Sequence, residues 1–138
     1  MRTFTFSDLS LGQSDTLLRT VMSADVEVFA TVSGDVNPIH LDDSYAASTR
    51  FGQRIAHGMF TASLISAVIG TKMPGPGAVY LSQTLRFLAP VKIGDVVAAT
   101  VSVAEKIDKG RRVRLDCACL VDGKPVLEGE AWVSVPAP

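Results

Sequence analysis

The feature that most constrains the fold is a stretch of apolar and small residues at positions 56–71 (AHGMFTASLISAVIGT). It contains no acidic residue, lysine or arginine, and proline and glycine interrupt the chain soon after it, at positions 74–77. A helix that is apolar or small almost all round is a buried helix, because it has no polar face to offer to water. The sequence therefore predicts a buried helix here, with Gly70 as its C-cap.

Strand patterns dominate the chain after this predicted helix. Apolar and polar residues alternate in four segments, residues 79–88, 95–107, 111–121 and 126–135. Asp108-Lys109-Gly110 and Asp122-Gly123-Lys124 are typical of hairpin turns between the last three segments. With a further strand expected at residues 16–22, the pattern predicts an α+β fold in which an antiparallel sheet curves around the helix. Pairing of the sheet edge with a second copy would make a homodimer.

Length and composition fit one domain covering residues 1–138. Hydrophobic residues make up 47% and charged residues 20%, an ordinary globular balance. No apolar run is long enough to span a bilayer and the N-terminus lacks a signal-peptide pattern, so we expect a cytoplasmic protein without a membrane partner. The net charge of −1, with acids and bases interspersed, predicts no nucleic-acid partner.

The two cysteines, Cys117 and Cys119, lie two positions apart in a predicted strand. Neighbours on one face of a strand rarely form a disulfide, and a metal site would need more ligands at recognisable spacings. We expect both to be small, buried, unbridged residues.

Before the buried helix, the segment Asp35-Val36-Asn37-Pro38-Ile39-His40 combines a carboxylate, a turn and an imidazole. A short helix is expected from an N-cap at Ser23 to Ser33-Gly34, and Pro38 is expected to exclude helix from the segment itself. In a continuous helix Asp35 and His40 would not share a face, but the Asn37-Pro38 turn can direct both side chains to one point. Two such titratable groups flanking a water are the minimum apparatus for adding or removing water.

The start of the buried helix, at His57-Gly58, offers a second functional element. Backbone N–H groups at a helix N-terminus lack partners within the helix and lie at the positive end of its dipole. A carbonyl oxygen placed there is stabilised as it becomes an enolate. Gly58 has no side chain to obstruct that approach.

These motifs together resemble a known family. Residues 29–40 (FATVSGDVNPIH), followed by Ala46-Ala47, closely resemble the hydratase-2 motif of MaoC-like proteins. Residues 56–59 (AHGM) and 87–95 (FLAPVKIGD) resemble later signatures of the same family. The resemblance covers nearly the whole chain and is closest to the short (R)-specific enoyl-CoA hydratases that feed polyhydroxyalkanoate synthesis. It implies a single hot-dog fold and reversible hydration of trans-2-enoyl-CoA to (R)-3-hydroxyacyl-CoA.

The resemblance also assigns roles to individual residues. It implies that Asp35 and His40 hold and activate a water, and that the thioester oxygen lies at the Gly58 N–H. Asn37 would orient the site, and Ser66 would match a serine that contacts the catalytic aspartate in similar proteins. The resemblance implies an acyl-chain tunnel near Val32, Leu64 and Ile65. It implies no metal and no cofactor beyond the CoA thioester, which is the substrate.

Other interpretations of these residues stay open on sequence alone. Asp35 can cap a turn, and His40 can be a core histidine. The His57 ring can point away and bond backbone, and Ser66 can bond a carbonyl one turn back. Two histidines and an aspartate can ligate a metal. Five cations near one hairpin are expected to be solvated, although some can meet CoA phosphates; they are Lys106, Lys109, Arg111, Arg112 and Arg114.

Two other functions also stay open. A hot-dog acyl-CoA thioesterase needs the same polarised thioester and an activated water. A non-catalytic acyl-CoA-binding module would keep the fold and the ligand without turnover.

Overall fold

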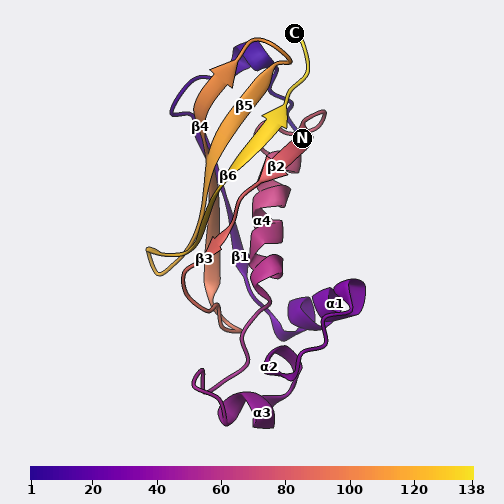
Figure 1. Ribbon diagram of the computed structural model, residues 1–138, viewed down its shortest axis with the longest axis vertical. Helices are drawn as coiled ribbons and strands as arrows, with labels where there is room; N and C mark the ends of the chain where they lie inside the picture. The colour runs from indigo at the N-terminus through magenta and orange to yellow at the C-terminus, as the bar shows by residue number, and fades with distance from the viewer.

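The computed structural model describes residues 1–138 and shows an antiparallel sheet of six strands curved around one long helix (Figure 1). The strands lie in the order β1-β4-β5-β6-β2, and β3 also pairs with β6. Their bounds are β1 (Ser14–Thr20), β2 (Val79–Gln83), β3 (Arg86–Phe87), β4 (Val96–Ile107), β5 (Arg112–Val121) and β6 (Lys124–Ser134). The α+β prediction is confirmed, as are the two hairpin turns that join β4 to β5 and β5 to β6.

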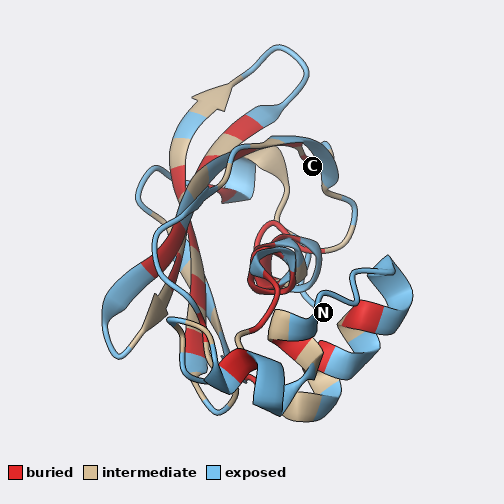
Figure 2. Cartoon of the chain, turned by 60° about the horizontal axis from the view of Figure 1, so that its bottom comes forward, coloured by how far each residue is buried: buried red, intermediate tan, exposed pale blue.

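The long helix, α4 (Gly58–Thr71), lies in the hollow of the sheet, which Figure 2 shows in a view nearly along the helix axis. Its sheet-facing side chains join the core formed by alternate residues of β4, β5 and β6. The prediction that this helix is buried on every side is wrong for the single chain. Its remaining face is an exposed stripe of Met59, Ser63, Ser66 and Gly70, and the helix continues past Gly70 to a C-cap at Lys72.

Two predicted strands differ in detail from those observed. The first runs over Ser14–Thr20 rather than residues 16–22, because the chain leaves the sheet at Met22 to begin the next helix. The segment 79–88 divides into β2 and β3 at Thr84. There the Thr84 carbonyl lies against Gly129 of β6. A Cβ at position 129 would be only 1.9 Å from the carbonyl oxygen, so this close approach of the two backbones requires glycine.

Three short helices, α1 (Ser23–Ser33), α2 (Pro38–Leu41) and α3 (Asp43–Ala47), lie at the end of the molecule that holds the start of α4 (Figure 1). The N-cap of α1 is Met22, one residue before the expected Ser23, because the Asp25 carboxylate accepts the Met22 N–H at 2.9 Å. Gly34 closes α1 in the left-handed conformation, as predicted, with φ of 79°.

The prediction that Pro38 excludes helix is wrong, because α2 begins at Pro38 itself. The first position of a helix tolerates proline, since its missing N–H would have no helical partner there. Asn37 caps this helix by accepting the Ile39 N–H on its side-chain oxygen, at 3.3 Å. Asp42 caps α3 by accepting the Tyr45 N–H on its carboxylate, at 3.0 Å.

None of the helices combines the length and the apolar character needed to cross a membrane. A 3-10 turn, η1 (Phe6–Asp8), precedes β1.

Cys117 and Cys119 are buried and unbridged, as predicted, and burial raises the pKa of their thiols to about 11 and about 12.

Candidate active site

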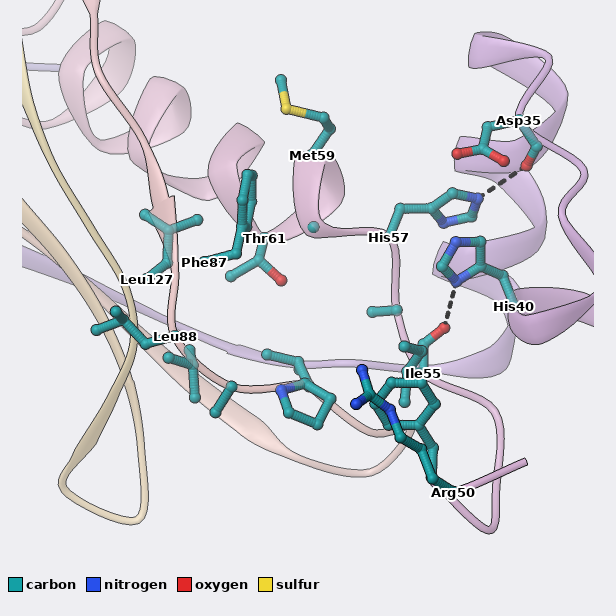
Figure 3. Close-up of a pocket in the computed structure, with 17 residues that line it drawn as sticks. Asp35, His40, Arg50, Ile55, His57, Met59, Thr61, Phe87, Leu88 and Leu127 are labelled. Atoms are coloured by element: carbon teal, nitrogen blue, oxygen red, sulfur yellow. Dashed lines mark hydrogen bonds between the residues drawn. The ribbon is translucent and has the colours of Figure 1, made fainter. Parts of the chain in front are cut away.

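A cavity of about 540 Å³ lies where the start of α4 meets α2 and the segment after β3. Figure 3 shows its polar side, formed by Asp35, His40 and His57, facing an apolar side that includes Phe87, Leu88 and Leu127. Asp35, His40 and Gly58, three residues singled out in the sequence, therefore line one space. A cavity that is mostly apolar with a few convergent polar groups is the usual form of a small-molecule site.

The turn between Asp35 and His40 is held by local hydrogen bonds. The Asp35 N–H donates to Ser33 Oγ at 3.1 Å, and the Asn37 N–H donates to the Asp35 carboxylate at 3.2 Å. Asn37 in turn caps α2, which carries His40. Asn37 therefore holds the turn through its backbone N–H at one end and its side-chain oxygen at the other, and it does not itself line the cavity.

His40 is fixed in one orientation and one tautomer. Its Nδ1 lies 2.7 Å from the carbonyl oxygen of Ile55, which can only accept, so Nδ1 carries the proton and Nε2 keeps a free lone pair. The side chain is buried, with 8% of its surface exposed. Burial lowers its pKa below the usual 6.5; the Ile55 carbonyl partly opposes this, neighbouring His57 lowers the pKa further, and Asp35 raises it. His40 is therefore a neutral acceptor at pH 7.

His57 forms the wall beside His40. Its Nε2 lies 2.9 Å from the Asp35 carbonyl oxygen, so Nε2 carries the proton. Its ring stacks on His40 with centroids 3.8 Å apart, and Phe29 packs on it at 4.9 Å. The expected bond to backbone is confirmed, but the ring does not point away from the site. Its buried Nδ1 has no hydrogen-bond partner.

Asp35, His40 and His57 each offer one ligand atom, and these atoms lie within 4.8 Å of one another. A metal ion bonds an imidazole nitrogen in the plane of the ring, along its lone pair. The two rings are stacked with an interplanar angle of only 27°, so one ion cannot lie on both lone-pair axes at bonding distance. The arrangement suits a water held by hydrogen bonds better than a metal ion.

Gly58 is the first residue of α4, and its N–H has no hydrogen-bond partner within the chain. A Cβ at this position would lie 2.7 Å from Cε1 of Phe87, so any larger residue would have to displace that ring. The free N–H and the positive end of the α4 dipole can therefore meet an oxygen inside the cavity.

The structure does not bring Ser66 to Asp35 within the chain. Ser66 lies in the exposed stripe of α4, outside the cavity, and makes no hydrogen bond. The expected tunnel residues are also elsewhere, because Val32 is 81% exposed on α1, and Leu64 and Ile65 belong to the core.

Sequence reasoning missed Arg50, Thr61 and the role of Phe87. Arg50 and Thr61 line the cavity from a loop and from α4, and Phe87 covers Gly58. A glycine at the first position of a buried helix signals a close contact without identifying the partner. The basic hairpin lies at the far end of the molecule from the cavity (Figure 1). There Lys106 donates to the Leu9 carbonyl at 2.6 Å and Arg114 pairs with Glu105 and other carboxylates.

Comparison with known proteins agrees with this geometry. Residues 11–118 match the model of the MaoC-like domain family. The 3-hydroxybutyryl-CoA dehydratase of Methylorubrum extorquens is 56% identical over 136 residues, which cover 99% of this chain and 87% of that protein. The (R)-specific enoyl-CoA hydratase of Aeromonas caviae is 41% identical over 129 residues, covering 93% and 96%.

A solved structure, the unliganded R-hydratase PhaJ1 of Pseudomonas aeruginosa, superposes with a TM-score of 0.95 at 45% identity. The match covers 99% of this chain and 88% of that one. The fold is therefore the hot-dog fold of these hydratases. The chain belongs to the MaoC-like family.

Proposed function

We propose that this chain is an enzyme that reversibly hydrates trans-2-enoyl-CoA to (R)-3-hydroxyacyl-CoA. The names of the two relatives describe this reaction in one direction or the other. The observation that carries the proposal is the placement of the Asp35 carboxylate and the free His40 Nε2 in one cavity with the unpartnered Gly58 N–H.

The three groups can divide the chemistry among them. A water that donates one hydrogen to Asp35 and one to His40 Nε2 presents its lone pair to the substrate. As its oxygen bonds C3, the Asp35–His40 pair takes a proton and the electrons of the double bond move to the thioester oxygen. The Gly58 N–H stabilises this enolate oxygen. The pair then returns the proton to C2 on the same face, so that one water is added in all.

The CoA portion would leave the cavity past Arg50. This side chain is exposed at the cavity wall, with its guanidinium over the Phe51 ring at 4.8 Å. A guanidinium binds phosphate well through paired N–H donors. We propose no metal and no cofactor, because the thioester is the substrate and the protein groups supply both proton transfer and charge stabilisation.

A homodimer is also part of the proposal. Two surfaces are left open on the single chain: the exposed stripe of α4, and the edge strand β2, where Val79, Tyr80 and Leu81 are exposed. Pairing with a second copy would cover an edge strand and a helix face that has no partner within the chain. Ser66 lies in that stripe and would become buried there.

The direct test uses crotonyl-CoA and follows the loss of conjugated thioester absorbance, with chiral analysis of the product. Asp35→Asn and His40→Ala are each expected to lower turnover by roughly 10²–10⁴, the usual contribution of general acid–base groups. Asp43→Asn, at a carboxylate 89% exposed on α3, is the matched control and should leave the rate unchanged. Release of free thiol from saturated acyl-CoA would indicate a thioesterase instead, and tight binding without turnover would indicate a binding module.

A further inference from the structure

Thr61, in the second turn of α4, has a buried hydroxyl without a partner. The residue is 2% exposed, and its Oγ1 makes no hydrogen bond within the chain. It lines the cavity that holds Asp35, His40 and Gly58. A buried polar group with no partner is costly and rare in folded proteins, so an unpartnered hydroxyl in this cavity wall points to a partner on a bound ligand.

Four other helical hydroxyls in this chain have a hydrogen-bond partner within their own helix. Four serines and threonines of α1 and α4 donate to a backbone carbonyl three or four residues earlier, at 2.5–3.0 Å. They are Thr31, Ser33, Ser63 and Thr71. This local bond is the ordinary solution for a hydroxyl in a helix. The Thr61 hydroxyl does not use it and is turned toward the cavity.

The direction of this hydroxyl brings it near the oxyanion site. Thr61 follows Gly58 by three residues, so the two lie on neighbouring positions of one helix face, and helical side chains lean toward the N-terminus. In Figure 3 the Thr61 oxygen points away from Leu127 and Phe87, toward the side of the cavity that holds His57 and His40.

We infer that the Thr61 hydroxyl donates a hydrogen bond to the thioester oxygen of the substrate, as a second donor beside the Gly58 N–H. This inference rests on the proposed function. The reacting end of an enoyl-CoA is a hydrocarbon chain apart from its thioester oxygen, which is therefore the acceptor available at this depth. As negative charge develops on that oxygen, both hydrogen bonds strengthen, and the transition state gains more than the ground state.

Two substitutions at position 61 separate the hydroxyl from the methyl group. Thr61→Val keeps the shape and removes the hydroxyl, and it is expected to lower kcat by at least about tenfold; loss of an oxyanion donor commonly costs about 10²–10³. Thr61→Ser keeps the hydroxyl and should retain kcat within about threefold. A residue that acts only through packing would show the reverse order, because serine leaves a gap and valine does not.

Thr71→Val is the matched control on the same helix. Its hydroxyl donates to the Ala67 carbonyl at 2.6 Å and lies outside the cavity. The rate should be unchanged in this variant. The two valine variants should also differ in stability, because Thr61→Val removes an unpartnered buried hydroxyl and should not lower the melting temperature, whereas Thr71→Val removes a satisfied one.

The deciding experiment adds a spectroscopic readout that does not depend on turnover. Butyryl-CoA labelled with ¹³C at the thioester carbonyl is bound to each protein, and the carbonyl stretching frequency is recorded by difference infrared spectroscopy. The wild type and Thr61→Ser should lower this frequency further than Thr61→Val does. An equal frequency in wild type and Thr61→Val, together with an unchanged kcat, would overturn the inference. Wild-type protein that does not hydrate crotonyl-CoA would instead overturn the proposed function.

Discussion

The imidazole rings of His40 and His57 stack with their centroids 3.8 Å apart, and each donates an N–H to a backbone carbonyl. His40 donates to Ile55 and His57 to Asp35, so the stack joins α2, the Asp35 turn and the start of α4. The neutral His40 ring keeps a free lone pair on Nε2. The stack thus presents a neutral base to the cavity in a fixed orientation.

The low pKa of His40 predicts a pH dependence of activity. Burial, aided by the nearby His57, lowers this pKa below 6.5 in the folded protein. The value of kcat/KM should therefore hold steady above pH 6.5 and fall only at more acidic pH, as His40 becomes protonated and loses its acceptor. A midpoint above pH 7 in the acidic limb of a crotonyl-CoA pH profile would contradict this account.

The same shift predicts a pH dependence of stability. Because the pKa of His40 is lower in the folded state than in the unfolded state, the unfolded chain binds more protons as the pH falls below 6.5. The contribution of His40 to the free energy of unfolding is fully present above pH 6.5 and is lost as the pH falls from there through the folded pKa. Urea unfolding at pH 7.5, 6.5 and 5.5 should show this loss in the wild type and a smaller loss in His40→Gln. An equal loss of unfolding free energy between pH 7.5 and 5.5 in the two proteins would show that His40 does not titrate as described.

His57→Phe should separate the role of His57 in positioning the Asp35 turn from its contribution to the free energy of unfolding. Phenylalanine can keep the contacts with His40 and Phe29, but it loses the bond to the Asp35 carbonyl. It also removes the unpartnered Nδ1, so the two effects offset and the free energy of unfolding should change by about 1 kcal/mol or less. Turnover should fall about tenfold or more, because the Asp35 turn is no longer held against α4. Full activity in a normally folded variant would remove this positioning role.

Gly58→Ala should lower activity through Phe87. The added Cβ would lie 2.7 Å from Cε1 and 2.9 Å from Cδ1 of that ring. Phe87 is 54% exposed and can rotate aside, so stability should change little while the displaced ring enters the cavity. We expect at least a tenfold loss of kcat/KM, and a smaller loss when the substitution is made in a Phe87→Ala background. An equal loss in both backgrounds would show that the new methyl group itself blocks the substrate.

Much of this site follows from local sequence rules. The long apolar stretch and the alternating strands predict a sheet around a helix, because periodicity reports burial directly. The Asp35–His40 segment is also local, since Gly34, Asn37 and Pro38 shape one turn within seven residues. The resemblance to MaoC-like proteins then predicts a catalytic role for Asp35 and His40 in that turn.

The remaining features depend on contacts between distant segments. The stacking of His57 on His40 joins residues 17 positions apart, and the contact of Phe87 with Gly58 joins residues 29 positions apart. No local sequence pattern predicts either contact. Ser66 is exposed because one face of α4 is left free by the sheet, a property of the whole fold. Pro38 taken alone predicts that helix is excluded, yet the fixed φ of its ring favours the first position of a helix, which is where the structure has it.

The central claim is that Asp35 and His40 hold a single water and return its proton to the same face of the substrate. Hydration of crotonyl-CoA in D₂O, followed by NMR of the 3-hydroxybutyryl product, tests it most directly. The account predicts one diastereomer, of R configuration at C3, with the deuterium at C2 and the hydroxyl at C3 added to the same face. It predicts that Asp35→Asn slows the appearance of that product at least about 100-fold. Addition to opposite faces, or a folded Asp35→Asn variant of near-normal rate, would contradict it.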